Sequence, residues 1–309
     1  MSEKKPRPSL ESTLKSVDTE EIIDLIFYRP VGYCWALLFY KFGIIPNVVT
    51  IASIFLGVAA GIMFYFDDLL YNVIGMLLLI WANMYDSADG QLARISDKKS
   101  EIGRALDGIA GDIWFFSIYL ALCLRLNDEW SYPIWIIAAI SGFFHGRQAA
   151  MADYYRNVHL FFLKGKSGSE LDNSKQQYAQ SRSLSWKDNL VPKLYHYFYG
   201  DYTAVQERLS PKFQRFLALL CKCYGEKVPQ TLADDFRQAS KPLMKYANML
   251  SFNTRVFVLF ITLFVGRPWI YFVFELTILN GLLIYMIYRH EVLSNRFYLQ
   301  LKRQFGCEK

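Results

Sequence analysis

This sequence has few of the features expected of a secreted or nucleic-acid-binding protein. Its five cysteines among 309 residues are odd in number and scattered, which argues against a disulfide framework and favours a reducing compartment. Cys221 and Cys223, in "CKC", lack the spacing of a zinc site. The first twenty residues contain no apolar core with a small-residue cleavage site, so we expect no signal peptide and a cytosolic N-terminus. No repeat of fixed period and no DNA or RNA module is recognisable, and we expect no nucleic-acid partner.

Apolar residues are abundant instead. The chain is 53% hydrophobic and 17% aromatic, yet 20% charged, which excludes an ordinary soluble domain and is typical of a polytopic membrane protein with polar parts outside the bilayer. A spanning helix needs about 20 mostly apolar residues. Six stretches qualify: 47–66, 70–90, 105–125, 131–152, 254–274 and 270–289. The last two are poorly separated at Gly266, Arg267 and Pro268, so we expect a tight turn there.

The spans predict one all-α membrane architecture, with six transmembrane helices. Before the first span lies an amphipathic segment that Arg29, Pro30 and Lys41 interrupt, so it should lie in the membrane interface. Gly57 and Gly61 in the first span form a small-xxx-small pair that allows close helix contact. We predict four parts: 1–45, cytosolic head and interfacial helix; 46–154, the first four spans; 155–253, a cytosolic or interfacial helical insertion; 254–309, the last two spans and a cytosolic tail.

If the N-terminus is cytosolic, most basic residues lie in segments on the cytosolic side of the membrane. The inside segments are the head, 94–104, 153–253 and the tail after 289, whereas the outside turns carry little beyond Arg125 and Arg267. The positive-inside rule therefore predicts that both termini are cytosolic, in the inner membrane if the chain is bacterial. The net charge of +6 indicates orientation and attraction to anionic lipid rather than nucleic-acid binding.

The stretch "MYDSADGQLARISDKKSEIGRALDGIAGD", residues 84–112, places charge between two apolar runs. Asp86 and Asp89 share a helix face at the end of the second span, and the short connection 95–104 brings Asp107 to the same boundary. Three carboxylates beside hydrocarbon repel one another unless a cation lies among them. Oxygen ligands suit Mg²⁺ or Mn²⁺, and Mg²⁺ characteristically shares its shell between carboxylates and substrate phosphates. We therefore predict a metal site that binds a diphosphate.

Three neighbouring residues fit a phosphate-bearing ligand. Gly90 permits backbone approach, Ala93 leaves a flat wall for a base or ribose, and Arg94 offers a fork for phosphate oxygens. The full spacing is DxxDGxxAR followed by GxxxD at Gly103 and Asp107, a pattern that composition alone rarely produces. At these residues the chain resembles the CDP-alcohol phosphotransferase (CDP-alcohol phosphatidyltransferase) family, over about 20–154 and 254–289.

The resemblance implies an activity and a set of roles. It implies six membrane helices, an interfacial lead-in helix, two divalent metals, and transfer from a CDP-linked lipid to the hydroxyl of a small polar alcohol with release of CMP. A homodimer is also implied. Carried over by position, the roles are metal binding for Asp86, Asp89 and Asp107, and nucleotide contact for Gly90, Ala93 and Arg94.

One position departs from the family motif. A fourth aspartate, metal ligand and base, is expected four residues after the third, but Gly111 stands there and Asp112 follows. In a regular helix Asp112 points about 140° away from Asp107, whereas a single π-turn, eased by Gly108 and Gly111, would align them. We favour Asp112 as the fourth ligand and base, acting beside Asp107. The alternative is a site that lacks its fourth carboxylate, with Asp112 paired to a neighbouring helix.

A second polar cluster ends the fourth span, in "SGFFHGRQAAMADYYRN". His145, Arg147, Gln148 and Arg156 are suited to holding a polyol or a phosphorylated polyol, so we favour inositol or inositol phosphate as acceptor. Packing of His145 and snorkelling of Arg147 are the alternative interpretation. Interhelical hydrogen bonding adequately explains Glu275 and Asn280 in the last span.

Other classes of function fit less well. The leading alternative is a non-catalytic nucleotide- or lipid-binding membrane protein with a degenerate fourth-aspartate site. A prenyl-diphosphate enzyme is disfavoured because the chain has one DxxD and no second aspartate-rich motif. An ion channel or transporter is disfavoured because the charges gather at one boundary rather than along a path through the bilayer. The motif leaves open whether the lipid is glycerol- or sphingoid-based.

Overall fold

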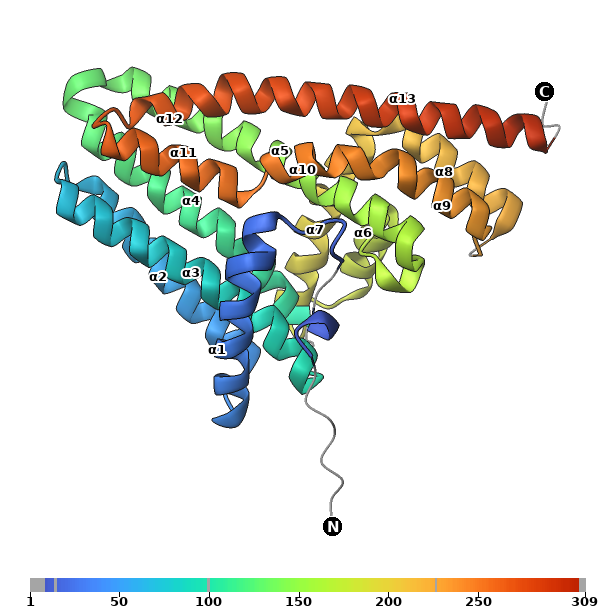
Figure 1. Cartoon of the computed structure of the whole chain (residues 1–309), viewed down its shortest axis with the longest axis horizontal. Coiled ribbons are helices and arrows are strands. Elements are labelled where there is room, and N and C mark those ends of the chain that lie inside the picture. Colours follow the sequence, from blue (N-terminus) through green and yellow to red (C-terminus); the bar gives the residue numbers. More distant parts are fainter. Residues whose placement is uncertain (1–8, 14–15, 99–100, 226, 306–309) are drawn as a thin grey trace, which may run out of the picture. The chain divides into compact units, whose positions relative to one another are not determined.

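The fold is all-helical, as predicted. The computed structural model describes residues 9–13, 16–98, 101–225 and 227–305, and every regular element in these ranges is a helix (Figure 1). π-helical segments, Asp24–Tyr28 and Glu275–Leu279, lie before α1 and α13. The α-helices are α1 (Arg29–Lys41), α2 (Pro46–Tyr65), α3 (Leu69–Ser96), α4 (Glu101–Trp130), α5 (Tyr132–Lys164), α6 (Ser174–Ser183), α7 (Leu190–Leu209), α8 (Pro211–Tyr224), α9 (Gln230–Ser240), α10 (Met244–Met249), α11 (Phe252–Phe264), α12 (Trp269–Phe274) and α13 (Asn280–Gln304).

Most of the predicted spans correspond to helices that are long and apolar enough to cross a membrane. Five helical stretches of the described chain are long and apolar enough to cross a bilayer: Pro46–Tyr65, Leu69–Ser96, Gly103–Trp130, Gln230–Phe264 and Trp269–Gln304. The predicted fourth span, 131–152, lies inside α5 except for its first residue, but it is not among these stretches. Its polar residues His145, Arg147 and Gln148 lower its hydropathy. The chain is thus an integral membrane protein, with five of its six predicted spans matched by helices of sufficient apolarity.

The turn between the last two spans corrects their predicted limits. α11 ends at Phe264 and α12 begins at Trp269, whereas the predicted spans ran to 274 and began at 270. Gly266 has a φ of +67°, a left-handed conformation that a side chain would strain. The tight turn expected at Gly266, Arg267 and Pro268 is therefore present. Apolar residues stand close on both sides of it, so hydropathy alone made the limits of the two spans overlap.

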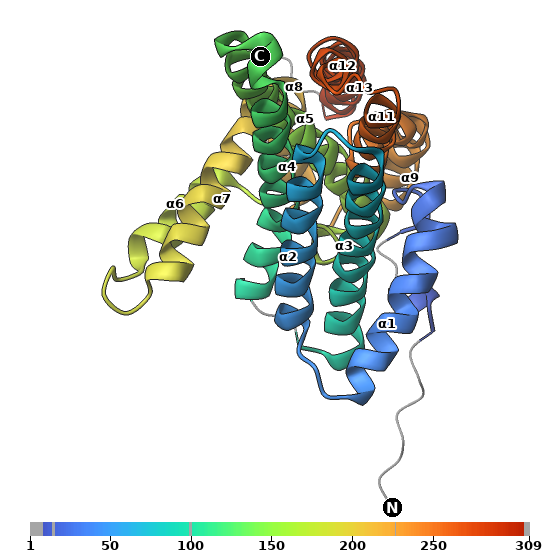
Figure 2. The same cartoon turned by 90° about the vertical axis from the view of Figure 1, so that its left-hand side faces the viewer.

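The described residues fall into two compact units. Unit 1 comprises Met1–Gly142 and Phe257–Phe272, and unit 2 comprises Phe143–Val256 and Val273–Lys309. In unit 1, α2 packs against both α3 and α4 (Figure 2). A Cβ atom added at Gly57 would collide with the Trp114 ring, and one added at Gly61 would collide with Ser117. The predicted close contact through these glycines is therefore confirmed, and α4 is the partner.

Helix α1 packs against the end of α3 that carries the acidic motif. A Cβ atom added at Gly32 would lie 2.9 Å from Ser87 Oγ, so only glycine permits this approach. Leu38 and Phe42 are exposed. An apolar surface on a short helix outside the spans is what an interfacial lead-in helix requires. The small core shared by α1 and its neighbours consists of Ala36, Val49, Ala88 and Leu92.

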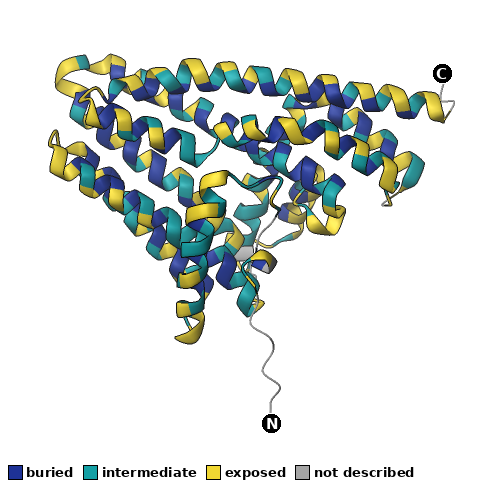
Figure 3. Ribbon diagram, viewed as in Figure 1, coloured by how far each residue is buried: buried dark blue, intermediate teal, exposed yellow. Residues whose placement is uncertain are grey.

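Unit 2 has an aromatic core. Phe162 of α5 stacks on Phe236 of α9, with ring centroids 4.0 Å apart, and Phe216 of α8 and Phe297 of α13 lie against the same ring. Buried and exposed positions alternate along α13 at helical spacing (Figure 3). The stretch Trp269–Gln304 is 36 residues long, about 54 Å at 1.5 Å per residue, against a hydrocarbon core of about 30 Å. The helix is therefore long enough to reach beyond a bilayer, and α8 packs on α13.

Candidate functional site

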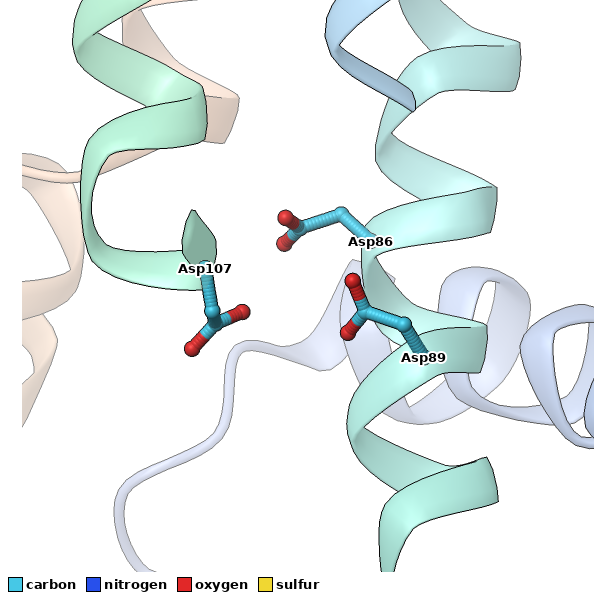
Figure 4. Close-up of side chains that lie close together, drawn as sticks. All are labelled: Asp86, Asp89 and Asp107. Carbon is cyan, nitrogen blue, oxygen red and sulfur yellow. The ribbon is translucent and has the colours of Figure 1, made fainter. Parts of the chain in front are cut away.

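Three carboxylates converge at the end of α3. Asp86 and Asp89 lie one turn apart on this helix, and Asp97, with a φ of +54°, ends it in a left-handed cap. Asp107 lies in the first turns of α4 and faces them (Figure 4). One oxygen from each carboxylate lies within 4.8 Å of the others. The structure thus brings together the three aspartates that sequence spacing placed at one boundary.

The burial of these carboxylates differs, and this tests whether a cation fits. Asp89 is only 3% exposed and Asp86 is half-buried, whereas Asp107 is exposed. The Oδ2 atom of Asp89 is fully buried, with no hydrogen-bond partner in the described part of the chain. A buried carboxylate oxygen without a partner is costly. Oxygen donors alone, close together and partly buried, are the ligand set that Mg²⁺ or Mn²⁺ prefers, so the residues fit a divalent cation.

The residues expected at the nucleotide follow on the same helix. The Arg94 guanidinium lies over Gly90, where an added Cβ atom would be 3.5 Å from Nη2. Arg94 Nε is buried and has no hydrogen-bond partner among the described residues. Ala93 is half-buried beside it. A cation with a donor still unused, close to a carboxylate cluster, can bind phosphate oxygens.

Sequence reasoning missed Gln91, which lies inside the motif. Its side chain is fully buried; Nε2 donates to the Arg29 carbonyl at 3.0 Å and to Ser87 Oγ at 3.3 Å. Thr13 Oγ1 donates to Gln91 Oε1 at 3.4 Å. Arg29 forms an ion pair with Glu20 at 2.8 Å. Gln91 therefore ties the N-terminal segment to the motif helix. No sequence signal pointed to this role, because the two partners in the N-terminal segment are 62 and 78 residues away.

The predicted π-turn in α4 is wrong. Glu101–Trp130 is α-helical throughout, so the residues around Gly108 and Gly111 contain no extra residue per turn. Asp112 is exposed and is not part of the carboxylate group. An i,i+5 pair in a regular helix differs by about 140°. A Cβ atom added at Gly108 or Gly111 would meet nothing within 4 Å, so both glycines face open space. The alignment proposed for Asp112 as fourth ligand and base is not present.

The predicted acceptor residues are divided among separate contacts in unit 2. His145 and Gln148 are buried, and both bond to Arg255: its Nη1 lies 3.1 Å from His145 Nδ1, and its Nη2 donates to Gln148 Oε1 at 2.6 Å. Arg147 lies over the Phe143 ring, 3.9 Å from its centroid. Arg156 donates to Asn248 Oδ1 and to Ser251 Oγ. His145 and Gln148 thus share Arg255, whereas Arg147 and Arg156 contact other residues.

Arg255 and Glu275 complete the network around His145. Arg255 is 1% exposed and Glu275 fully buried, and their side chains form an ion pair. Gln148 Nε2 donates to the Glu275 carbonyl at 3.2 Å and to Asn280 Oδ1 at 2.7 Å. The interhelical hydrogen bonding expected for Glu275 and Asn280 is therefore present. Arg255 was missed; its only signal was a single arginine at the start of an apolar run.

Comparison with known proteins is consistent with the motif. The model of the CDP-alcohol phosphatidyltransferase family matches residues 43–154, which include every residue of the motif. The bifunctional IPC transferase and DIPP synthase of Aquifex aeolicus (strain VF5) is 30% identical over 97 residues, 31% of this chain and 22% of that relative. The chain thus spans about a fifth of the length of the relative it matches. No solved structure matches the chain.

Proposed function

We propose that the protein is a phospholipid-synthesising transferase, because residues 43–154 match the model of the CDP-alcohol phosphatidyltransferase family. The hydroxyl oxygen of a small polar alcohol attacks the β-phosphorus of a CDP-linked lipid. A new phosphorus–oxygen bond forms, the bond to CMP breaks, and the hydroxyl proton passes to a carboxylate. The convergence of Asp86, Asp89 and Asp107 is the observation that carries this proposal.

The carboxylate group would hold Mg²⁺ or Mn²⁺, as a two-metal site. Asp86, Asp89 and Asp107 supply oxygen ligands, and the unpartnered Oδ2 of Asp89 supports this assignment. Bound divalent cations neutralise the diphosphate and favour departure of CMP. Arg94 binds phosphate oxygens through its unused donors, while Gly90 and Ala93 leave room for the nucleotide.

Asp107 is the carboxylate best placed to take the proton of the acceptor hydroxyl. It is the exposed member of the group, so an acceptor arriving from water can reach it. The prediction of this role for Asp112 depended on a π-turn, which α4 lacks. A positioned carboxylate can serve as general base even when it also binds a cation, provided one oxygen stays accessible.

For the acceptor, a polyol or polyol phosphate is favoured, inositol or inositol phosphate first. Of the four residues predicted to bind it, Arg147 and Arg156 carry the positive charge that attracts anionic groups, whereas His145 and Gln148 lie in the buried Arg255 network. The distribution of basic residues supports an orientation in which both termini and the carboxylate group lie on the cytosolic side. The family resemblance supports a homodimer.

A second candidate function is a nucleotide- or lipid-binding membrane protein without catalysis. The observation that favours it is the regular helix of α4: among the residues that the structure describes, the carboxylate group has no fourth member. Such a protein would bind a CDP-linked lipid but would not release CMP.

The deciding experiment is a CMP-release assay on the purified full chain in lipid nanodiscs. CDP-diacylglycerol is offered with inositol, inositol phosphate, glycerol phosphate or serine, with Mg²⁺, Mn²⁺ or EDTA. We expect CMP only with a divalent cation and with one acceptor, and mass spectrometry of the lipid product identifies that acceptor. Turnover that persists in EDTA would overturn the metal site; saturable binding of the CDP-lipid without CMP release would favour the second candidate.

A further inference from the structure

Helices α6 and α7 form a hairpin with an exposed aromatic face. They lie side by side (Figure 2) and are joined by residues 184–189. We define the hairpin face as Trp186, Leu190, Val191, Tyr197 and Phe198, which are between 48% and 64% exposed. Leu190, Tyr197 and Phe198 follow helical spacing along one side of α7. Exposed large apolar residues gathered in this way mark an interaction surface.

The hairpin is held to its own unit by other residues. His196 bonds to Gln177 at 2.8 Å, and Glu207 accepts from the backbone N–H of Ser174 at 3.0 Å. Gln206 Nε2 donates to the Ala150 carbonyl of α5 at 2.9 Å. These contacts fix α7 against α6 and α5 without using the hairpin face.

Cations border the hairpin face. A cleft of about 610 Å³ is lined by Tyr178, Trp186, Tyr197 and Phe198, with Arg182 and Lys193 among its polar groups. Arg182 and Lys187 are exposed. Lys193 lies 4.9 Å over the Trp186 ring and donates to the Ser181 carbonyl at 2.8 Å. Aromatic rings beside exposed cations match the headgroup layer of a membrane, where Trp and Tyr are enriched and anionic lipids attract Lys and Arg.

The connection between α5 and α6 is long enough for the hairpin to reach a bilayer that α5 crosses. α5 contains the predicted fourth span and ends at Lys164, and α6 begins at Ser174. The segment between them can extend at most about 30 Å, comparable to the thickness of a hydrocarbon core. We propose that the α6–α7 hairpin docks on the surface of the membrane that carries the chain. The hairpin face inserts at headgroup depth, and Arg182 and Lys187 contact anionic lipid phosphates.

The test measures the depth of single positions in the full chain. Its own cysteines are replaced, and a fluorophore is attached through Leu190→Cys or Phe198→Cys, or through Gln180→Cys as the matched control. Gln180 is also exposed and belongs to the same hairpin, but it does not line the cleft. One copy is placed in each nanodisc, and the quencher is a lipid with a nitroxide near the top of its acyl chain. We expect quenching at positions 190 and 198 to be severalfold stronger than at 180. Equal quenching at the three positions would overturn the proposal.

Lipid composition and a second variant complete the test. In discs that contain phosphatidylglycerol, R182Q/K187Q should lose part of the quenching at position 198, whereas in pure phosphatidylcholine it should change little. Inorganic phosphate at high concentration should leave the quenching unchanged; displacement by it would assign the cleft to a free anion and contradict docking. Shielding of the fluorophore that occurs only in discs with two copies would assign the hairpin face to self-association, and would equally overturn the proposal.

Discussion

Charge is unbalanced in the carboxylate group of unit 1, whereas it is balanced in the Arg255 network of unit 2. In unit 1, three like charges lie together, and an oxygen of Asp89 has no hydrogen-bond partner among the described residues. In unit 2, Arg255 faces Glu275, His145 and Gln148, and donor and acceptor are matched. A buried charge that the protein itself does not satisfy calls for a ligand, whereas a matched set holds helices together.

The largest expected effect concerns the unmatched group. D89N should lower CMP release about 100-fold or more, because several kcal/mol of charge stabilisation depend on the bound cation. Its unfolding temperature in EDTA should not fall, since removing one of three like charges relieves repulsion. Mg²⁺ should raise the unfolding temperature of the wild type but not of the variant.

The matched control for this substitution is D97N. Asp97 is exposed at the end of the same helix, and asparagine tolerates its left-handed backbone well. It should keep both turnover and the stabilisation by Mg²⁺. A normal rate for D89N would mean that Asp89 is not a ligand.

The Arg255 network should respond in the opposite way, because removing one of its charges should lower the stability of the protein. R255M leaves the fully buried Glu275 carboxylate without its guanidinium partner, which should cost about 3–5 kcal/mol of stability. R255M/E275L removes both charges and should recover most of that loss. Thermal unfolding in nanodiscs measures both. A single variant as stable as the wild type would show that the ion pair does not hold these helices together.

The smallest effect is expected at Asp112. If α4 stays regular, D112N should leave turnover nearly unchanged, because exposed substitutions away from a site usually change free energies by about 0.5 kcal/mol or less. D107N in the same assay should lose turnover. Loss of turnover in D112N, with CDP-lipid binding intact, would show instead that α4 rearranges on binding and that Asp112 is the base.

Motif spacing predicted the carboxylate group because its geometry is local. Asp86 and Asp89 lie on one helix, and only a short connection separates that helix from Asp107, so helix period and loop length together determine where the side chains meet. The same reasoning failed for Asp112. Whether a helix accommodates an extra residue depends on what packs around it, and the glycines reveal only that the distortion is permitted.

The polar cluster of α5 shows a second limit. His145, Arg147 and Gln148 lie within one turn, and sequence alone could only suggest that they act together. Their partners are Arg255, about 110 residues later, and Phe143 nearby. Periodicity identifies the face on which a residue lies, but not the residue that a distant helix brings against it.

For this chain, the sequence by itself determined the membrane class, most of the spans and the meeting of three aspartates, because apolar length, helix period and short loops are properties of neighbouring residues. Only the tertiary structure decided that Gln91 ties the N-terminal segment to the motif, that Arg255 neutralises Glu275, and that α4 runs without a π-turn. Each of these depends on which side chains of distant segments satisfy one another's charges and hydrogen bonds. That pairing is settled by packing rather than by spacing along the chain.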